Sequence, residues 1–184
     1  MHTNELVKNR IMITGANGML GQRTVEYYSS KENFELLATS IEDKSVIDSV
    51  DYIPCDIKSR ENIKKLIYDY CPDFIIHTAA FTNVDLSEKM REDAWKINVK
   101  GVEYIAEAAR TIDAQIIHIS TDYIFDGKNG PYDENAIPNP IGYYGRTKSG
   151  LLLRAIPYNT FVLNIAKRVP LILSAFSLAS FVLP

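Results

Sequence analysis

The residue pair Tyr144 and Lys148 has the types and the spacing that carbonyl chemistry needs. The surrounding sequence predicts a helix from about Tyr143, and positions four apart on a helix share one face. A phenol with its usual pKa of about 10 is a poor acid–base catalyst at neutral pH, and a nearby ammonium lowers that pKa because it favours the phenolate. The tyrosine can then donate a proton to a carbonyl while a nicotinamide delivers hydride. Taken alone, such a pair is more often part of a solvated helix face.

A glycine loop supplies the context that this pair needs. The segment Gly15-Ala-Asn-Gly18-Met-Leu-Gly21 closes an apolar strand predicted over Arg10–Thr14 and opens a helix that extends to about Ser29. Glycines permit positive φ and let the backbone approach a pyrophosphate, and the start of a helix presents unpaired N–H groups to phosphates. The spacing is G-x-x-G-x-x-G, for which a structural turn is the simpler alternative. The strand–loop–helix order favours a dinucleotide site.

The end of the second predicted strand, Phe34–Thr39, bears on the choice between NAD and NADP. NAD sites usually place an acid there, about 20 residues after the glycine loop, to bind the ribose 2′-hydroxyl. The sequence is Thr39-Ser40-Ile41-Glu42-Asp43, with no acid at the strand tip and no arginine for a 2′-phosphate. We interpret Glu42 and Asp43 as solvated loop charges. The sequence therefore predicts NADP or NAD and slightly favours NADP.

Apolar runs alternate with amphipathic ones through most of the chain. Further strands are predicted to end at Tyr52–Pro54 and to span Phe74–His77, Gln115–Ser120 and Phe161–Ile165. Helices are predicted at Ser59–Tyr70, with Ser59 as N-cap, and at Glu92–Thr111, where Ala94, Ile97, Ile105 and Ala108 face inward. Continuously apolar strands separated by helices are typical of a parallel sheet covered on both faces. The predicted fold class is α/β, a doubly wound parallel sheet of the NAD(P)-binding Rossmann fold, over residues 1–168.

Composition excludes several classes of function. The net charge of −3 over 184 residues gives no electrostatic basis for a nucleic-acid partner. Two cysteines make no disulfide framework and three histidines have no metal-ligand spacing, so we expect no metal site. We interpret His77 and His118 as satisfied histidines at strand ends rather than as catalysts. The N-terminus lacks the apolar core of a secretory signal, which predicts a cytoplasmic location.

The last 16 residues, 169–184, contain no charged side chain. A helix needs about 20 apolar residues to cross a bilayer, so this segment predicts a buried or aberrant tail and no membrane partner.

Six segments carry a family resemblance: ITGANGMLGQ (13–22), CDI (55–57), IIHTAAFTNVDLSE (75–88), AWKINVKGVEYIAEAA (94–109), HISTDYIFDG (118–127) and GPYDENAIPNPIGYYGRTK (130–148). The sequence resembles the extended short-chain dehydrogenase/reductases, and within them the dTDP-4-dehydrorhamnose reductase family. The segment that begins Ser120-Thr121-Asp122-Tyr123 is the specific part of the match. The implied activity is NAD(P)H-dependent reduction of the 4-keto group of a nucleotide-linked 6-deoxysugar, as in dTDP-L-rhamnose synthesis, with a homodimer as one option.

The resemblance also implies a role for each matching residue. The cofactor-binding residues would be Gly15, Asn17, Gly18, Met19, Leu20 and Gly21 around the pyrophosphate, Asp56 and Ile57 at the adenine, Ala79 and Ala80 along the cofactor, and Tyr144 and Lys148. The catalytic residues would be Thr121, Asp122, Tyr144 and Lys148, with Thr121, Asp122 and Tyr123 also close to the sugar. From the residues alone, Asp56 can equally cap a turn.

The likeness fades after Lys148. The family continues into a C-terminal region that binds the nucleotide sugar, so we expect residues 169–184 to be a divergent or truncated remnant of that region. Two alternatives stay open for the function: a sugar-nucleotide epimerase or dehydratase, and a non-catalytic dinucleotide-binding subunit that resembles the β subunit of methionine adenosyltransferase.

Overall fold

A fully parallel sheet forms the centre of the molecule. The computed structural model describes residues 8–48, 50–133, 135–152 and 160–164. Six strands are hydrogen-bonded in the order β3-β2-β1-β4-β5-β6: β1 (Asn9–Thr14), β2 (Phe34–Thr39), β3 (Asp51–Tyr52), β4 (Phe74–His77), β5 (Gln115–Ser120) and β6 (Thr160–Asn164). This is the strand order of the doubly wound Rossmann fold, which confirms the predicted fold class.

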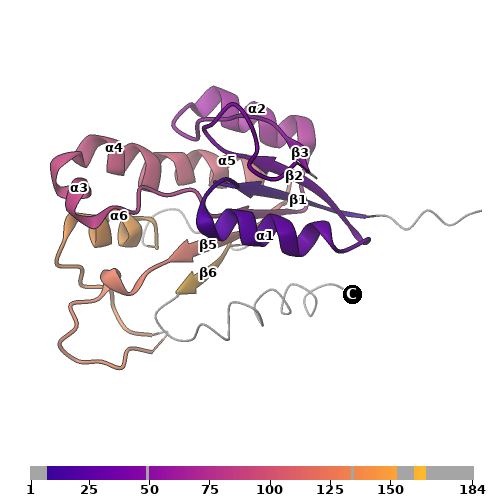
Figure 1. Cartoon of the computed structure of the whole chain (residues 1–184). Coiled ribbons are helices and arrows are strands. Elements are labelled where there is room, and N and C mark those ends of the chain that lie inside the picture. Colours follow the sequence, from indigo (N-terminus) through magenta and orange to yellow (C-terminus); the bar gives the residue numbers. More distant parts are fainter. Residues whose placement is uncertain (1–7, 49, 134, 153–159, 165–184) are drawn as a thin grey trace, which may run out of the picture.

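Helices cover both faces of the sheet (Figure 1). The helical segments are α1 (Met19–Ser29), α2 (Arg60–Tyr70), α3 (Val84–Lys89), α4 (Arg91–Trp95), the π-helical η1 (Lys96–Gly101), α5 (Val102–Thr111), the 3-10 turn η2 (Asp122–Ile124) and α6 (Tyr143–Leu152). On one face, α1 contributes Val25 and Tyr28 to a core cluster with Ile13 of β1. On the other, α2 and α5 contribute Ile63 and Ile105.

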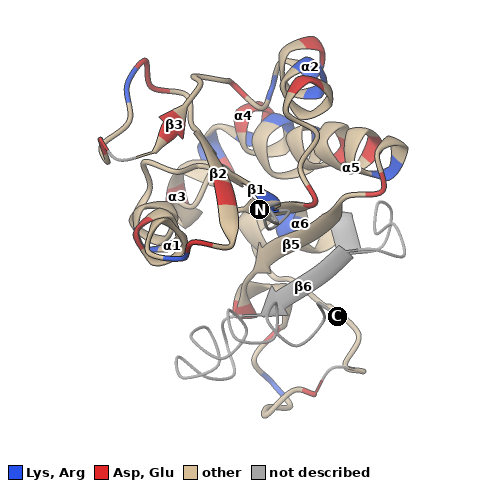
Figure 2. Ribbon diagram, turned by 90° about the vertical axis from the view of Figure 1, so that its right-hand side faces the viewer, with Lys and Arg blue, Asp and Glu red and all other residues tan. Residues whose placement is uncertain are grey.

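The burial of both faces explains why the strands are apolar without alternation. Met12 and Ile13, neighbours in β1, are each fully buried, one in each core cluster. Lysines and arginines are interspersed with acids on the outer sides of α2 and α5 (Figure 2). No helix in the described ranges is long and apolar enough to cross a bilayer.

The element boundaries match the predicted ones closely, and the main differences lie in the third strand and in the helices after β4. The third strand ends at Tyr52, before Ile53 and Pro54. The polar segment after β4 contains α3, which begins at an Asn83 cap whose side chain accepts from the Leu86 N–H at 2.9 Å. The helix predicted over Glu92–Thr111 is interrupted by η1. Ser59 does cap α2, as predicted.

The sixth strand is observed one residue earlier than predicted, at Thr160–Asn164. The predicted tail at 169–184 and the domain boundary at 168 lie outside the described residues.

Candidate active site

The carboxyl ends of three central strands bring the predicted site residues to one edge of the sheet. The glycine loop follows β1, Thr78–Ala80 follow β4, and Thr121 follows β5. Because β1 and β5 both pair in parallel with β4, these three loops leave the sheet side by side. Ligands of open parallel sheets bind at this edge.

The glycine loop depends on a close contact with the loop after β4. Gly15 has a φ of +69°, and a Cβ added there would lie 2.5 Å from the Ala79 nitrogen. Only glycine tolerates both the positive φ and this approach. Gly18 caps α1 without a side-chain hydrogen bond, and the first turn of α1 contains no acid. The first N–H groups of α1 therefore suit an anion such as a pyrophosphate.

Asn17 has a structural contact that the sequence did not predict. Its side-chain nitrogen donates to Glu42 Oε2 at 3.1 Å and to the Lys44 carbonyl at 2.9 Å, and its Oδ1 accepts from the Val46 N–H at 3.0 Å. The side chain thus holds the loop after β2 against the glycine loop. Asn17 is one of the predicted pyrophosphate contacts, but its side chain hydrogen-bonds to other residues of the protein in this structure.

The same contact changes the interpretation of Glu42. Glu42 is an exposed loop residue, as the sequence suggested, but the structure also places its carboxylate beside the glycine loop. A hydrogen bond from Ser40 is the largest cause that lowers the pKa of Glu42, and Asn17 adds to it. Glu42 is therefore an anion fixed next to the predicted cofactor site.

The predicted adenine residues have local roles in the described structure. Asp56 Oδ1 accepts from the Lys58 N–H at 2.9 Å, which is the turn cap that the sequence left open. The Ile57 side chain is buried and belongs to the core cluster that also contains residues of α2 and α5. Ala79 and Ala80 are half-buried at the end of β4, beside Gly15.

Tyr144 and Lys148 lie on the buried face of α6, with 8% and 3% of their surfaces exposed. The face packs closely against η2, because a Cβ added at Gly145 would overlap the Tyr123 carbonyl oxygen. This contact brings Tyr144 next to Thr121 and Tyr123; the Tyr123 and Tyr144 rings meet edge to face at 5.8 Å. The Thr121 hydroxyl accepts from the Tyr123 N–H at 3.3 Å and donates to Asp122 Oδ1 at 3.1 Å.

The pKa of Tyr144 differs from the sequence-based expectation. Burial raises the pKa of this phenol above 10.0, and its hydrogen bond with Thr121 opposes the rise without cancelling it. Lys148 does not lower it, because the ammonium points at the sheet: Lys148 Nζ lies 3.3 Å from His118 Nε2. Tyr144 is accordingly a protonated phenol at neutral pH.

Burial acts on Lys148 in the opposite direction. It lowers the pKa of the ammonium from 10.5 to about 8. Lys148 therefore remains mostly protonated at neutral pH and loses its proton at mildly alkaline pH. The two members of the predicted pair thus keep their protons at pH 7, but in different surroundings.

Asn98 in η1 is a site residue that the sequence argument missed. It is 1% exposed, accepts from the Phe81 N–H at 2.8 Å, and donates to the Phe81 carbonyl and to Thr147 Oγ1, each at 3.0 Å. It thereby connects the loop after β4 to the helix that carries Tyr144. The available signal was its position four residues after the inward-facing Ala94, where an amide would be costly unless it were hydrogen-bonded.

The family model described as the RmlD substrate binding domain matches residues 9–151, which include every predicted site residue. The chain belongs to the RmlD family. This agrees with the resemblance to the dTDP-4-dehydrorhamnose reductases among the extended short-chain dehydrogenase/reductases.

Three similar proteins illustrate what this chain resembles. The dTDP-4-dehydrorhamnose reductase of Aggregatibacter actinomycetemcomitans is 37% identical over 141 residues, covering 76% of this chain and 44% of that protein. The methionine adenosyltransferase 2 subunit beta of Bos taurus is 34% identical over 145 residues, with 76% and 40% covered. The crystal structure of dTDP-4-dehydrorhamnose reductase from Bacillus anthracis, in complex with NADP, superposes with a TM-score of 0.66 at 30% identity, covering 85% and 53%.

This RmlD-family chain spans about half the length, or less, of these relatives. Within the described ranges, no group of three or more histidine, cysteine or acidic side chains is placed to hold a metal ion.

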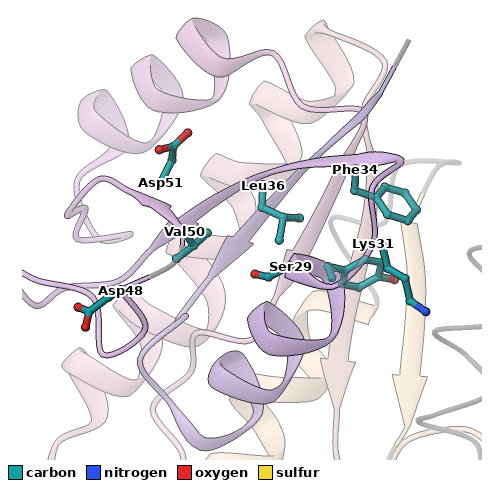
Figure 3. Close-up of a pocket in the computed structure, with 8 residues that line it drawn as sticks. Ser29, Lys31, Phe34, Leu36, Asp48, Val50 and Asp51 are labelled. Carbon is teal, nitrogen blue, oxygen red and sulfur yellow. The ribbon is translucent and has the colours of Figure 1, made fainter. Parts of the chain in front are cut away.

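A cavity of about 350 Å³ lies away from the RmlD-family site residues (Figure 3). Its walls come from the end of α1 and from the beginnings of β2 and β3, including Lys31, Phe34 and Asp51. Because all strands are parallel, the beginnings of the strands lie at the opposite edge of the sheet from the glycine loop. This cavity is separate from the candidate active site.

Proposed function

We propose that this chain is the dinucleotide-binding and proton-donating part of an RmlD-family reductase. It would reduce the 4-keto group of a nucleotide-linked 6-deoxysugar, and its cofactor would be NADPH or NADH. The single observation that carries the proposal is the grouping of Tyr144, Thr121 and Lys148 at the same sheet edge as the glycine loop. The relatives named as dTDP-4-dehydrorhamnose reductases support the substrate class.

The residues at this edge fit a dinucleotide. The start of α1, which has no acid in its first turn, and the backbone at Gly15 and Gly18 suit a pyrophosphate and support the proposal. The exposed apolar side chains of Ile41 and Ile53 follow β2 and β3, where a flat base would cover them. When bound, the reduced nicotinamide supplies hydride to the carbonyl carbon. A relative solved with NADP supports this assignment.

The protein's own residues would handle the proton. The Tyr144 phenol donates its proton to the carbonyl oxygen as that oxygen gains negative charge. The Thr121 hydroxyl, which donates to Asp122 in the free chain, would turn to donate its hydrogen bond to the same oxygen. The raised pKa of Tyr144 suits this direction, because reduction needs the protonated phenol and oxidation needs the phenolate. The Lys148 ammonium is buried on the same helix, one turn after Tyr144, and would contribute a fixed positive charge beneath the site.

The test is oxidation of NADPH and of NADH by the purified chain supplied with dTDP-4-dehydro-6-deoxy-L-mannose. Tyr144→Phe removes only the hydroxyl, and we expect it to lower kcat by about 10²–10⁴-fold while the dinucleotide affinity stays unchanged. Tyr143→Phe is the matched control on the same helix. Product formation without net cofactor oxidation would instead indicate an epimerase or a dehydratase.

A second candidate is a non-catalytic dinucleotide-binding subunit. The observation that favours it is the 34% identity to methionine adenosyltransferase 2 subunit beta over most of this chain. Dinucleotide binding by titration, no turnover with the keto sugar, and co-purification of a synthetase would support this function over the first. The predicted cytoplasmic location and homodimer belong to either proposal and are checked by fractionation and by light scattering.

A further inference from the structure

A row of buried polar side chains crosses the sheet beneath the candidate site. In the strand register, Thr14 of β1 is paired with Thr39 of β2 and with His77 of β4, and His77 is paired with His118 of β5. Residues paired in this way project from the same face of a sheet. None of these four side chains is more than 1% exposed. The apolar core on this face therefore ends in a polar row at the edge that carries the site.

The two histidines of this row each use one ring nitrogen. His77 Nδ1 lies 2.6 Å from Thr14 Oγ1, and His118 Nε2 lies 3.3 Å from Lys148 Nζ. The rings stack at 5.4 Å with an interplanar angle of 17°. Among the described residues, His77 Nε2 and His118 Nδ1 have no hydrogen-bond partner. The expectation that both histidines are satisfied is therefore only half correct.

Both rings are neutral at physiological pH. Burial lowers the pKa of His77 to about 3, and burial together with the charge of Lys148 lowers the pKa of His118 well below its usual value. An ammonium has no lone pair, so Lys148 donates and His118 Nε2 accepts. The proton of the His118 ring is consequently on Nδ1.

Among the described residues, no ion pair offsets the cost of burying the Lys148 ammonium, and His118 is its one side-chain hydrogen-bond partner. Burial alone shifts the pKa of Lys148. The titratable groups that face it from the sheet are His118, through the hydrogen bond, and His77, whose pKa is lowered by the charge of Lys148. On its own helix, Tyr144 lies one turn before it. None of the charged residues on the other elements packed against α6 is buried. They are Asp85, Glu88 and Lys89 of α3, Arg91, Glu92 and Asp93 of α4, Lys96 and Lys100 of η1, and Asp122 of η2.

We propose that His118 is a positioning residue for Lys148: its neutral ring accepts a hydrogen bond from the buried ammonium and fixes the long side chain against β5. A neutral acceptor anchors the ammonium without cancelling its charge, whereas a carboxylate would neutralise it. This inference rests on the proposed function for its use in catalysis, but the contact itself is a property of the free chain. His77 supports the His118 ring by stacking and does not touch Lys148 through a hydrogen bond.

The test measures the Lys148 amine directly, by NMR titration of the chain labelled in the lysine ε-carbons, with Lys148→Met for assignment. His118→Phe keeps a ring of similar size and removes the acceptor. Because a hydrogen bond to the charged form favours that form, we expect the pKa of Lys148 to fall by about one unit or more. His118→Gln places an amide oxygen near the former Nε2, and should restore the pKa.

The matched control is His77→Phe, which removes an equally buried histidine one strand away. It should leave the pKa of Lys148 near the parent value. An unchanged pKa in His118→Phe, or equal falls in the His118→Phe, His118→Gln and His77→Phe proteins, would overturn the proposal and leave only a packing role. If His118→Phe fails to fold, His118→Leu serves the same comparison.

Activity provides a separate measurement. If the chain reduces the keto sugar, the alkaline limb of its kcat profile should move to lower pH in His118→Phe and return in His118→Gln. If no variant and no parent chain turns over, the proposed function fails, and the NMR titration still decides whether His118 positions Lys148.

Discussion

One half of the candidate site is formed by main-chain groups and the other by buried side chains. The half around β1 and α1 is made by main chain: Gly15 allows a close approach to Ala79, and the start of α1 presents N–H groups. The half around α6 is made by buried side chains from separate elements, in which Lys148 meets His118 and Asn98 meets Thr147. A main-chain site tolerates many substitutions that keep the backbone path. A buried polar site depends on every partner, since an unpaired buried group is costly.

Acid should disturb the side-chain half most. His77 has a pKa of about 3 in the folded chain and an ordinary value of 6.5 when unfolded. Between these pH values the unfolded state binds a proton that the folded state does not. The folded state therefore has its full stability, as far as His77 is concerned, above about pH 6.5, and loses stability as the pH decreases. We expect a loss of about 1.4 kcal/mol per pH unit from His77, measured by urea unfolding at several pH values.

The control is His77→Gln, which cannot titrate. The slope of its unfolding free energy against pH should be smaller, by the amount that corresponds to about one bound proton. Parallel curves for the two proteins would show that burial of His77 carries no such energetic cost, and would weaken the contrast between the two halves.

The main-chain half should fail on addition of a single methyl group. Gly15→Ala combines a positive φ with an overlap on the Ala79 backbone, and we expect a loss of about 2–4 kcal/mol in unfolding free energy together with weaker dinucleotide binding. Gly127 has a similar φ of +76° with no atom within 4 Å of an added Cβ. Gly127→Ala therefore measures the conformational strain alone, and an equal loss in both variants would exclude the overlap as the cause.

The smallest effect is expected at the border of the main-chain half. Glu42 is held beside the glycine loop, where a fixed anion disfavours the 2′-phosphate of NADPH. Glu42→Gln should raise the affinity for NADPH relative to NADH by a few-fold, given the usual weakness of exposed charges. Titration of both dinucleotides measures the ratio, with Asp43→Asn as control. An unchanged ratio would return Glu42 to the role of a solvated charge.

The contrast also explains what sequence reasoning could predict. The glycine loop, the strand ends and the Tyr144–Lys148 face follow from short-range spacing, and the structure has them where the pattern placed them. The partners of Lys148 and Asn98 do not follow, because they depend on strand register and on contacts between residues 30 to 49 positions apart. Asn17 shows the same limit: its motif position suggested a phosphate contact, but its partners are on the loop after β2.

The close contact between Gly145 and Tyr123 limits how the residues of the site can move relative to one another. Since α6 and η2 touch backbone to backbone, Thr121 and Tyr144 belong to one rigid body, and neither can shift without the other. The segment that leaves η2 returns to the same place, where the Asn139 N–H donates to the Ile124 carbonyl at 2.8 Å. A change confined to the chain between these two residues would therefore leave Thr121 and Tyr144 in place.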